Sequence, residues 1–239
     1  MIEAKELTKK YGSTIAVDSV SFTAKPYRVT GFLGPNGAGK STTMRMLVGF
    51  ARPDSGEARI LGVPFTDVPN PGRHVGVLLD ASAVHKGRTG RETLTLAAMT
   101  MGLGPEAVDR ALSRVGLTKK EAGRRTGGYS LGMRQRLGIA QALLADPSVL
   151  ILDEPANGLD PSGIRWMRDL LREFANEGGT VLLSSHQLAE IDQIADDIVI
   201  MGGGRVLAEG TKTSLTADGS LEDLFFGATA HQDREGAAA

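Results

Sequence analysis

The stretch "GPNGAGKST", Gly34–Thr42, decides the fold, because it matches the pattern G-x-x-x-x-G-K-[ST]. It follows the apolar run "VTGFL" and precedes "KSTTMRMLVGF", which predicts a strand, a glycine-rich loop and a helix from Lys40 to Gly49. Glycines let the loop backbone curl until its N–H groups face a phosphate chain, and the start of the helix adds a favourable dipole. The alternative is a glycine-rich turn before an ordinary helix. The residues expected to hold phosphates are Gly34, Asn36, Gly37, Ala38, Gly39, Lys40, Ser41 and Thr42.

Two side chains of this loop carry most of the expected chemistry. Lys40 is a point charge that can reach the β- and γ-phosphates, and the hydroxyl of Ser41 is suited to Mg²⁺. The loop therefore predicts binding of a nucleoside triphosphate with a magnesium ion.

The second half of the expected site lies at the end of a buried strand. "SVLILDEP" places Asp153 and Glu154 at a strand end, where α/β sheets bind ligands. In proteins with such a phosphate loop an Asp at this position holds Mg²⁺, and the adjacent Glu154 can polarise an attacking water as general base. An Asp-Glu-Pro strand end alone is a common turn signal, so the assignment depends on the phosphate loop. His186, after "TVLLSS", ends another strand; a lone histidine is more often structural, but here the sheet is expected to aim it at the γ-phosphate.

Strands and helices alternate along most of the chain, which predicts an α/β fold. From Gly90 to Ala145 the pattern becomes helical with no strand between, which predicts a helical subdomain inserted into the α/β core. We expect one domain over residues 1–226, with its core at about 1–80 and 147–226 and the helical subdomain at about 81–146. A polar tail at 227–239 is expected to be flexible.

The expected elements follow from local composition. Strands are expected at Ile2–Leu7, Ser19–Ala24, Arg28–Leu33, 56–61, 74–79, 148–153, 180–185, 197–201 and around Val206. Helices are expected at Lys40–Gly49, 91–103, 105–117, 131–145, from Pro161, and at 187–195.

Composition narrows the class of protein further. The 239 residues carry 27 Lys plus Arg against 28 Asp plus Glu, a balance that argues against a strongly basic nucleic-acid binder. Cysteine is absent, which excludes disulfides and thiolate metal sites and suits a cytosolic protein. The longest apolar runs are far shorter than the ~20 residues that span a bilayer. We therefore expect any membrane role to come through a partner.

Taken in order, the motifs resemble those of the nucleotide-binding subunit of an ABC transporter, from about Ile2 to Leu224. Gly34–Thr42 matches Walker A, Val149–Glu154 matches Walker B, and Tyr129–Met133, "YSLGM", matches the family signature. In addition, Tyr11 in "KKYG" is similar to the aromatic residue that stacks on adenine, Asp160 in "ANGLD" to the D-loop aspartate, and His186 to the switch histidine.

The resemblance implies a fold, an activity and partners. The fold is a P-loop NTPase (RecA-like) core with an inserted helical subdomain and an N-terminal antiparallel β part. The activity is ATP hydrolysis with Mg²⁺, which drives a separate integral membrane permease. The family assembles head to tail, so that ATP lies between Walker A of one subunit and the signature of the other. Because one chain carries every motif, a homodimer is favoured, positioned in the cytoplasm at the inner face of the cell membrane through its partner. No nucleic acid is expected as a partner.

Two departures from the family pattern stand out. Asp80 occupies the place of the usual glutamine that touches Mg²⁺ and the coupling interface; its carboxylate can lie near the metal but adds negative charge. With "VHKGRTGRETL" after it, this replacement resembles ATPases of antibiotic and peptide exporters of the bacitracin-resistance type.

The second departure lies in the signature, where Leu131 replaces a glycine and Met133 replaces the final glutamine. Ser130 is suited to cap the helix that follows, and Gly132 lets a phosphate approach the first turn. We expect Ser130 and Gly132 to contact the opposite subunit's ATP, and Met133 to serve packing, because it cannot complete a capping box.

Two other classes of function fit the sequence less well. A soluble ABC-type ATPase acting on DNA or ribosomes is expected to carry coiled coils, zinc cysteines or two cassettes, and this chain has none of them. A GTPase is expected to carry an Asn-Lys-x-Asp motif, which is absent, and neither a GTPase nor a small-molecule kinase explains "YSLGM". The sequence therefore favours the motor subunit of an exporter, and we expect its cargo to be a drug, an antibiotic or a peptide.

Overall fold

The computed structural model describes residues 1–230, and the chain divides into two compact units. The first unit comprises Met1–Val68 and the chain from Arg172 onward, and the second comprises Pro69–Leu171. The division falls inside helix α6, Pro161–Asn176. No helix among residues 1–230 is both long and apolar enough to cross a membrane.

The first unit begins with an antiparallel sheet in the strand order β2-β1-β4. Its strands are β1 (Ile2–Tyr11), β2 (Thr14–Ala24) and β4 (Ser55–Ile60). Strands β1 and β2 form a hairpin whose last pair is Tyr11 and Thr14, with Gly12 at φ +60° in the turn. This sheet is the antiparallel β part that the sequence predicts at the N-terminus.

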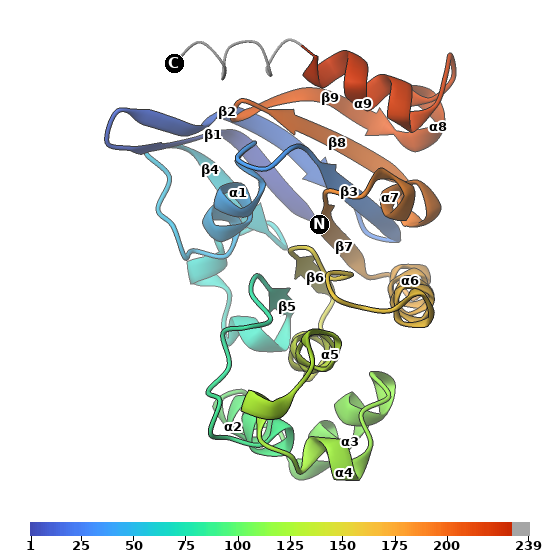
Figure 1. The fold of residues 1–239 in the computed structure, drawn as a ribbon. Helices are drawn as coiled ribbons and strands as arrows, with labels where there is room; N and C mark the ends of the chain where they lie inside the picture. Colours follow the sequence, from blue (N-terminus) through green and yellow to red (C-terminus); the bar gives the residue numbers. More distant parts are fainter. Residues whose placement is uncertain (231–239) are drawn as a thin grey trace. The chain divides into compact units, whose positions relative to one another are not determined.

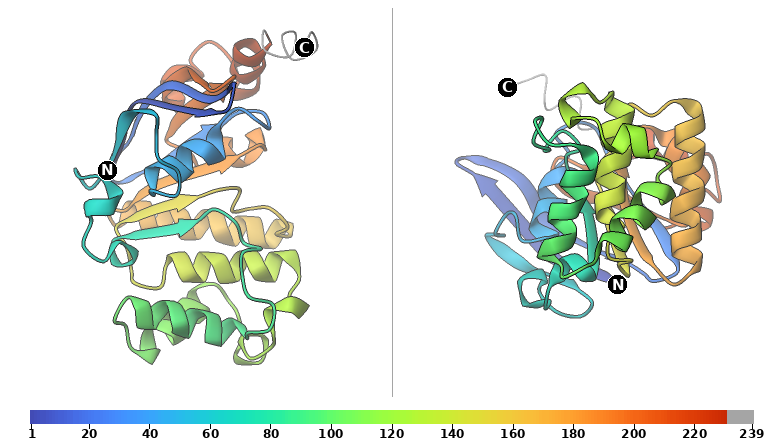
Figure 2. Two further views of the ribbon diagram at one scale, coloured as in Figure 1. Left: turned by 90° about the vertical axis from the view of Figure 1, so that its left-hand side faces the viewer. Right: turned by 90° about the horizontal axis from the view of Figure 1, so that it is seen from below.

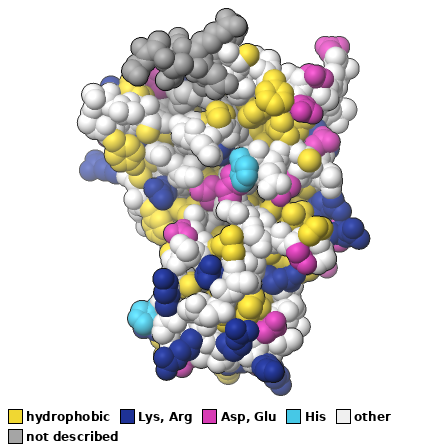
Figure 3. Space-filling view, viewed as in Figure 1, with side chains coloured by type: hydrophobic (Ala, Val, Ile, Leu, Met, Phe, Trp, Pro, Cys, Tyr) yellow, Lys and Arg dark blue, Asp and Glu magenta, His cyan; other side chains and the backbone are white. Residues whose placement is uncertain are grey.

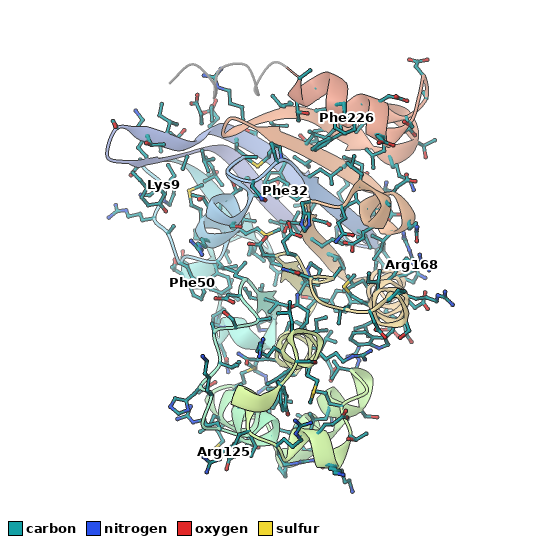
Figure 4. The ribbon with its side chains drawn as sticks, in the orientation of Figure 1. Lys9, Phe32, Phe50, Arg125, Arg168 and Phe226 are labelled. Atoms are coloured by element: carbon teal, nitrogen blue, oxygen red, sulfur yellow. The ribbon has the colours of Figure 1, made fainter. Side chains whose placement is uncertain are left out.

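The same unit holds parallel strands that carry the phosphate loop. β3 (Arg28–Leu33) pairs in parallel with both β7 (Thr180–Ser185) and β8 (Asp197–Gly202), and β9 (Arg205–Thr211) runs antiparallel to β8. Strands β3, β7 and β8 are almost fully buried, as expected for parallel strands covered on both faces. Phe32, labelled in Figure 4, packs against Phe22 of β2 with ring centroids 5.1 Å apart.

Helices complete the first unit, as Figure 1 shows. They are α1 (Lys40–Leu47), α7 (Leu188–Ile194), α8 (Lys212–Leu215) and α9 (Leu221–Thr229), with a 3-10 turn at Phe65–Asp67. Helix α7 approaches β3 closely: a β-carbon on Gly31 would lie 2.5 Å from Cγ2 of Ile191. Glycine at this position therefore lets the helix pack directly on the strand backbone.

The second unit combines two parallel strands with a group of helices (Figure 2). Strand β5 (Val75–Leu78) pairs with β6 (Val149–Leu152), and no strand lies in residues 90–145, as the sequence predicts. The helices are α2 (Gly90–Thr100), α3 (Pro105–Arg114), α4 (Lys119–Ala122) and α5 (Leu131–Ala142), with 3-10 turns at Pro71–Arg73 and Thr126–Gly128.

Helix α5 packs against β5 at two glycines. A β-carbon on Gly76 would lie 2.1 Å from the carbonyl oxygen of Ala142, and one on Gly138 would lie 2.6 Å from a methyl of Leu78. Strands β5 and β6 belong to the same compact unit as these helices.

The C-terminal prediction needs one correction. Helix α9 continues through Thr229, so the first residues of the predicted tail at 227–239 are helical. Ser220 begins this helix with a capping box closed by Asp223, a start signal that the sequence reading overlooked. The remainder of the predicted tail, residues 231–239, lies outside the described residues.

Candidate functional site

The phosphate loop of the first unit is closed by its own lysine. Lys40 is buried at 7% exposure, and its Nζ donates hydrogen bonds to the carbonyl oxygens of Gly34 (2.5 Å) and Pro35 (3.2 Å). The ammonium group therefore lies inside the loop that the sequence predicts, and it is tied to the loop's first residues.

The glycine at the start of helix α1 is required by the backbone. Gly39 has φ +98°, and a β-carbon there would lie 2.5 Å from the carbonyl oxygen of Ala16 on β2. At Gly37, φ is +81° and the space around a β-carbon is open. The loop backbone thus lies close against β2 at Gly39, whereas the space beside Gly37 is open.

Two hydroxyl residues follow the lysine. Ser41 and Thr42 are half-buried in the first turn of α1, whereas Thr43 is fully buried and its Oγ1 donates to the carbonyl of Gly39 at 3.0 Å. Ser41 is therefore partly exposed in the first turn after the loop, and its hydroxyl oxygen is a ligand of the kind that Mg²⁺ prefers.

His186 and Tyr11 are both exposed in the first unit. His186 follows the last residue of β7, and the turn is shaped by Ser185, whose Oγ accepts from the N–H of Gln187 and donates to Glu190 Oε2, both at 2.9 Å. Tyr11 is the last residue of β1, which continues beyond the expected strand end at Leu7, and 54% of its surface is exposed. The ammonium of Lys9 lies 5.6 Å from its ring centroid. The ring is thus available to a planar ligand.

Asp153 and Glu154 follow strand β6 in the second unit. The N–H of Asp153 donates to the carbonyl of Leu78 on β5 at 2.7 Å, which continues the parallel ladder by one residue. Glu154 then turns into the left-handed region at φ +49°, which a residue with a β-carbon adopts only when its surroundings hold it there. Both carboxyl residues are half-buried.

Gln135 is a residue that the sequence reading missed. Its Nε2 donates to the carbonyl oxygen of Glu154 at 2.7 Å, and the N–H of Asn157 donates to the same oxygen at 3.1 Å. Gln135 is buried at 3% exposure on α5. The signal available in the sequence is spacing: Ile139 and Ala142 follow Gln135 by four and seven residues, which places this polar side chain on the buried face of the helix.

Asp80 lies after β5 and is exposed. Its Oδ1 accepts hydrogen bonds from the N–H (2.7 Å) and the hydroxyl (2.6 Å) of Ser82, so the carboxylate shapes its own turn. The glutamine usual at this position lacks this charge.

The signature begins helix α5, as its sequence predicts. Ser130 is the N-cap, and its Oγ accepts from the N–H of Met133 at 3.2 Å. Met133 is half-buried. Leu131, which replaces a glycine of the family pattern, packs against Gly158: a β-carbon on Gly158 would lie 2.3 Å from Cγ of Leu131. The N-terminal turn of α5 therefore rests on the loop that follows Glu154.

Asp160 caps helix α6 within the second unit. Its carboxylate accepts from the N–H of Gly163 at 2.8 Å and from the hydroxyl of Ser162 at 2.9 Å. These two hydrogen bonds, the first foremost, lower the pKa of Asp160 below its ordinary value. The structure thus gives this predicted D-loop residue a capping task.

The surface before the signature is basic. Two segments, 85–88 and 124–127, lie side by side through backbone hydrogen bonds, among them Thr126 N–H to Arg88 O at 2.8 Å. Exposed Lys86, Arg88, Arg124 and Arg125 belong to them, and Figure 3 shows Lys and Arg side chains gathered over the helices of this unit. We call this set the basic patch.

The predicted site residues divide between the two units. Tyr11, the phosphate loop and His186 belong to the first unit. The second unit contains Asp80, Ser130, Gly132, Asp153, Glu154 and Asp160. Within the second unit, α5 directly contacts the segment from Glu154 to Gly158 through Gln135 and Leu131.

Comparison with known proteins agrees with these motifs. The family model described as "ABC transporter" matches residues 17–157. The chain is 43% identical over 212 residues to the bacitracin transport ATP-binding protein of Bacillus licheniformis, covering 87% of this chain and 69% of that one. It is 41% identical over 218 residues to the daunorubicin/doxorubicin resistance ATP-binding protein of Streptomyces peucetius, covering 90% and 66%.

A solved structure extends the likeness to nearly the whole fold. An ATP-binding subunit of an ABC transporter superposes with a TM-score of 0.87 at 30% identity, covering 95% of this chain and 99% of that one. The phosphate loop, the Walker B strand and the capped signature helix are thus found in a chain whose sequence and fold are those of one family. The chain belongs to the ABC transporter family, as an ATP-binding subunit that hydrolyses ATP.

Proposed function

We propose that this chain is the motor of an exporter that removes an antibiotic or other drug through a membrane permease on a separate chain. The observation that carries the proposal is the identity of 41–43% to subunits named for bacitracin transport and for daunorubicin/doxorubicin resistance. In this proposal the protein works at the cytoplasmic face of the membrane, attached through the permease.

The phosphate loop is proposed to bind the triphosphate. Lys40 neutralises the β- and γ-phosphates, while backbone N–H groups at Gly37 and Gly39 and the start of α1 favour their negative charge. Tyr11 stacks on adenine, for which its exposed ring is suited. The remaining loop residues Gly34, Asn36, Ala38, Ser41 and Thr42 complete the cradle.

Hydrolysis is assigned to the residues at the strand ends. Glu154 accepts the proton of the attacking water as general base, and His186 contacts the γ-phosphate. Ser41 and Asp153 are proposed as Mg²⁺ ligands, because a hydroxyl and a carboxylate oxygen are donors that this ion prefers. When bound, Mg²⁺ would neutralise part of the negative charge of the triphosphate.

The signature is proposed to act on a second copy of the chain. In a head-to-tail homodimer, Ser130 and Gly132 contact the γ-phosphate bound by the opposite subunit, with Asp160 in the adjoining D-loop. The N-terminus of α5 and the basic patch support this role, because the helix dipole and the positive charges both favour an anion. One chain carries every motif, so two identical copies complete two sites.

Asp80 is proposed to lie near the metal and to remain functional. Its carboxylate already accepts two hydrogen bonds from Ser82, which show that it can act as an acceptor in a fixed turn. Asp80→Ala is expected to reduce the steady-state rate of ATP hydrolysis about tenfold or more. Unchanged turnover together with unchanged export would contradict a functional Asp80.

The transport role is tested by co-purification. The tagged chain, extracted in mild detergent from its own cells, is expected to bring down a polytopic membrane protein, and its deletion is expected to sensitise the cells to an antibiotic. Recovery of ribosomes or DNA instead of a membrane protein would contradict the proposal.

A further inference from the structure

The side chain of Gln135 makes a contact with the catalytic segment that none of the assigned roles explains. Its amide nitrogen donates to the carbonyl oxygen of Glu154 at 2.7 Å, across from helix α5 to the end of β6. Gln135 is one of the few buried polar side chains among residues 1–230. A buried amide of this kind is kept in place by its partners, because leaving it without a hydrogen bond is costly.

The residue that receives this hydrogen bond is held in an uncommon backbone conformation. Glu154 has φ +49°, and its carbonyl accepts from Gln135 and from the N–H of Asn157. The backbone conformation of a residue sets the direction in which its side chain leaves the chain. The hydrogen bonds that hold the carbonyl of Glu154 therefore also limit the directions that its carboxylate can take.

Helix α5 contributes further contacts to the same segment. Leu131 packs against Gly158, and a β-carbon on Gly132 would lie 2.9 Å from the carbonyl oxygen of Gly158. The helix therefore touches the Glu154–Gly158 segment in its first turn and again at Gln135, one turn later. The contact at Gln135 reaches the backbone of Glu154 itself.

We propose that Gln135 is a positioning residue, which holds the backbone of Glu154 so that its carboxylate is aimed at the attacking water. This inference rests on the proposed role of Glu154 as general base. It also makes the aim of Glu154 depend on the position of α5, the helix that begins with the signature. Gln135 touches neither substrate nor metal in this proposal, so its loss affects the rate of the chemical step and leaves nucleotide binding intact.

Two substitutions remove the donor in different ways. Gln135→Glu keeps the length and shape of the side chain but replaces the donating NH₂, and Gln135→Leu removes all polarity. Each is expected to lower kcat for ATP about tenfold or more, with KM and the Kd for ATP within about twofold of the wild type. Gln141 provides the matched control: it lies exposed on the same helix, and Gln141→Glu and Gln141→Leu are expected to leave both parameters unchanged.

A double-mutant cycle separates positioning from a general loss of structure. If Gln135 acts through the carboxylate of Glu154, its substitution costs nothing more once that carboxylate is removed by Glu154→Gln. The rates are measured in single-turnover experiments with enzyme in excess over ATP, with a thermal melt of each variant. The expected result is a large effect of Gln135→Glu in the wild-type background and no further loss in the Glu154→Gln background.

Several results would overturn the proposal: wild-type turnover in both folded Gln135 variants, an effect confined to KM, or an equal further loss in the Glu154→Gln background. Unfolding of both variants would do the same, because Gln135 would then serve the stability of the fold. The underlying function fails separately, if the wild type does not hydrolyse ATP or if Glu154→Gln alone turns over at the wild-type rate.

Discussion

The carbonyl oxygen of Ala16 on β2 lies 2.5 Å from the point that a β-carbon on Gly39 would occupy. The residue that opens helix α1 must therefore be glycine, for its φ of +98° and for the space beside it. This contact places the phosphate loop against the hairpin of β1 and β2, whose first strand ends at Tyr11.

Gly39→Ala is expected to lower the free energy of unfolding more than Gly12→Ala does. The left-handed conformation alone costs an alanine roughly 1–2 kcal/mol, and the contact with Ala16 adds to that cost. Gly12→Ala is the control, since Gly12 has φ +60° with open space around a β-carbon. Urea unfolding gives the two losses in free energy of unfolding, and equal losses would show that the contact with Ala16 is easily relieved.

Ser130→Arg is expected to prevent ATP-driven dimerisation, because a long cation at the helix start fills the space that the opposite subunit's phosphate needs. The readout is the elution volume on size exclusion with ATP in the Glu154→Gln background, where dimers should accumulate. Met133→Leu keeps an apolar side chain of similar volume and is expected to dimerise as before. A dimer that survives Ser130→Arg but fails with Met133→Leu would reverse the assignment of the signature.

Asp160 predicts a dependence of stability on pH. Hydrogen bonds from Gly163 and Ser162 lower its pKa in the folded protein, so the ionised form is favoured in the folded state. The contribution of Asp160 to the free energy of unfolding is fully present above the ordinary aspartate pKa of ~3.9. It is lost as the pH falls through the lower pKa that Asp160 has in the folded protein. Between pH 6 and pH 3 the melting temperature of Asp160→Asn is expected to fall less than that of the wild type, and identical profiles would contradict this account.

The sequence predicted the segments whose pattern is local. The phosphate loop, strand β3 and the start of α6 at Pro161 appear where expected, because glycine spacing, β-branched runs and a proline at the first helical position act over short distances. Ser130 as N-cap is confirmed for the same reason.

Features that depend on tertiary contacts were not predicted. The hairpin of β1 and β2 extends to Tyr11 through a polar stretch that has no strand pattern of its own. Strand β5 lies in the same compact unit as α5 and packs closely against it at Gly76 and Gly138, a contact that no local pattern in the sequence indicates.

The candidate site shows the same limit. Asp153 and Glu154 could be found from a strand end next to a phosphate loop, whereas the bond from Gln135 joins residues 19 positions apart in the chain. Nothing in the spacing of a single sequence indicates that this glutamine meets that carbonyl.

Glu154 is proposed to be the general base of this ATPase. The most direct measurement compares Glu154→Gln with the wild type for both ATP binding and steady-state hydrolysis. The substitution is expected to keep the Kd for ATP and to lower the rate about a hundredfold or more, whereas Lys40→Ala is expected to lose binding itself. Hydrolysis by Glu154→Gln at the wild-type rate would contradict the account.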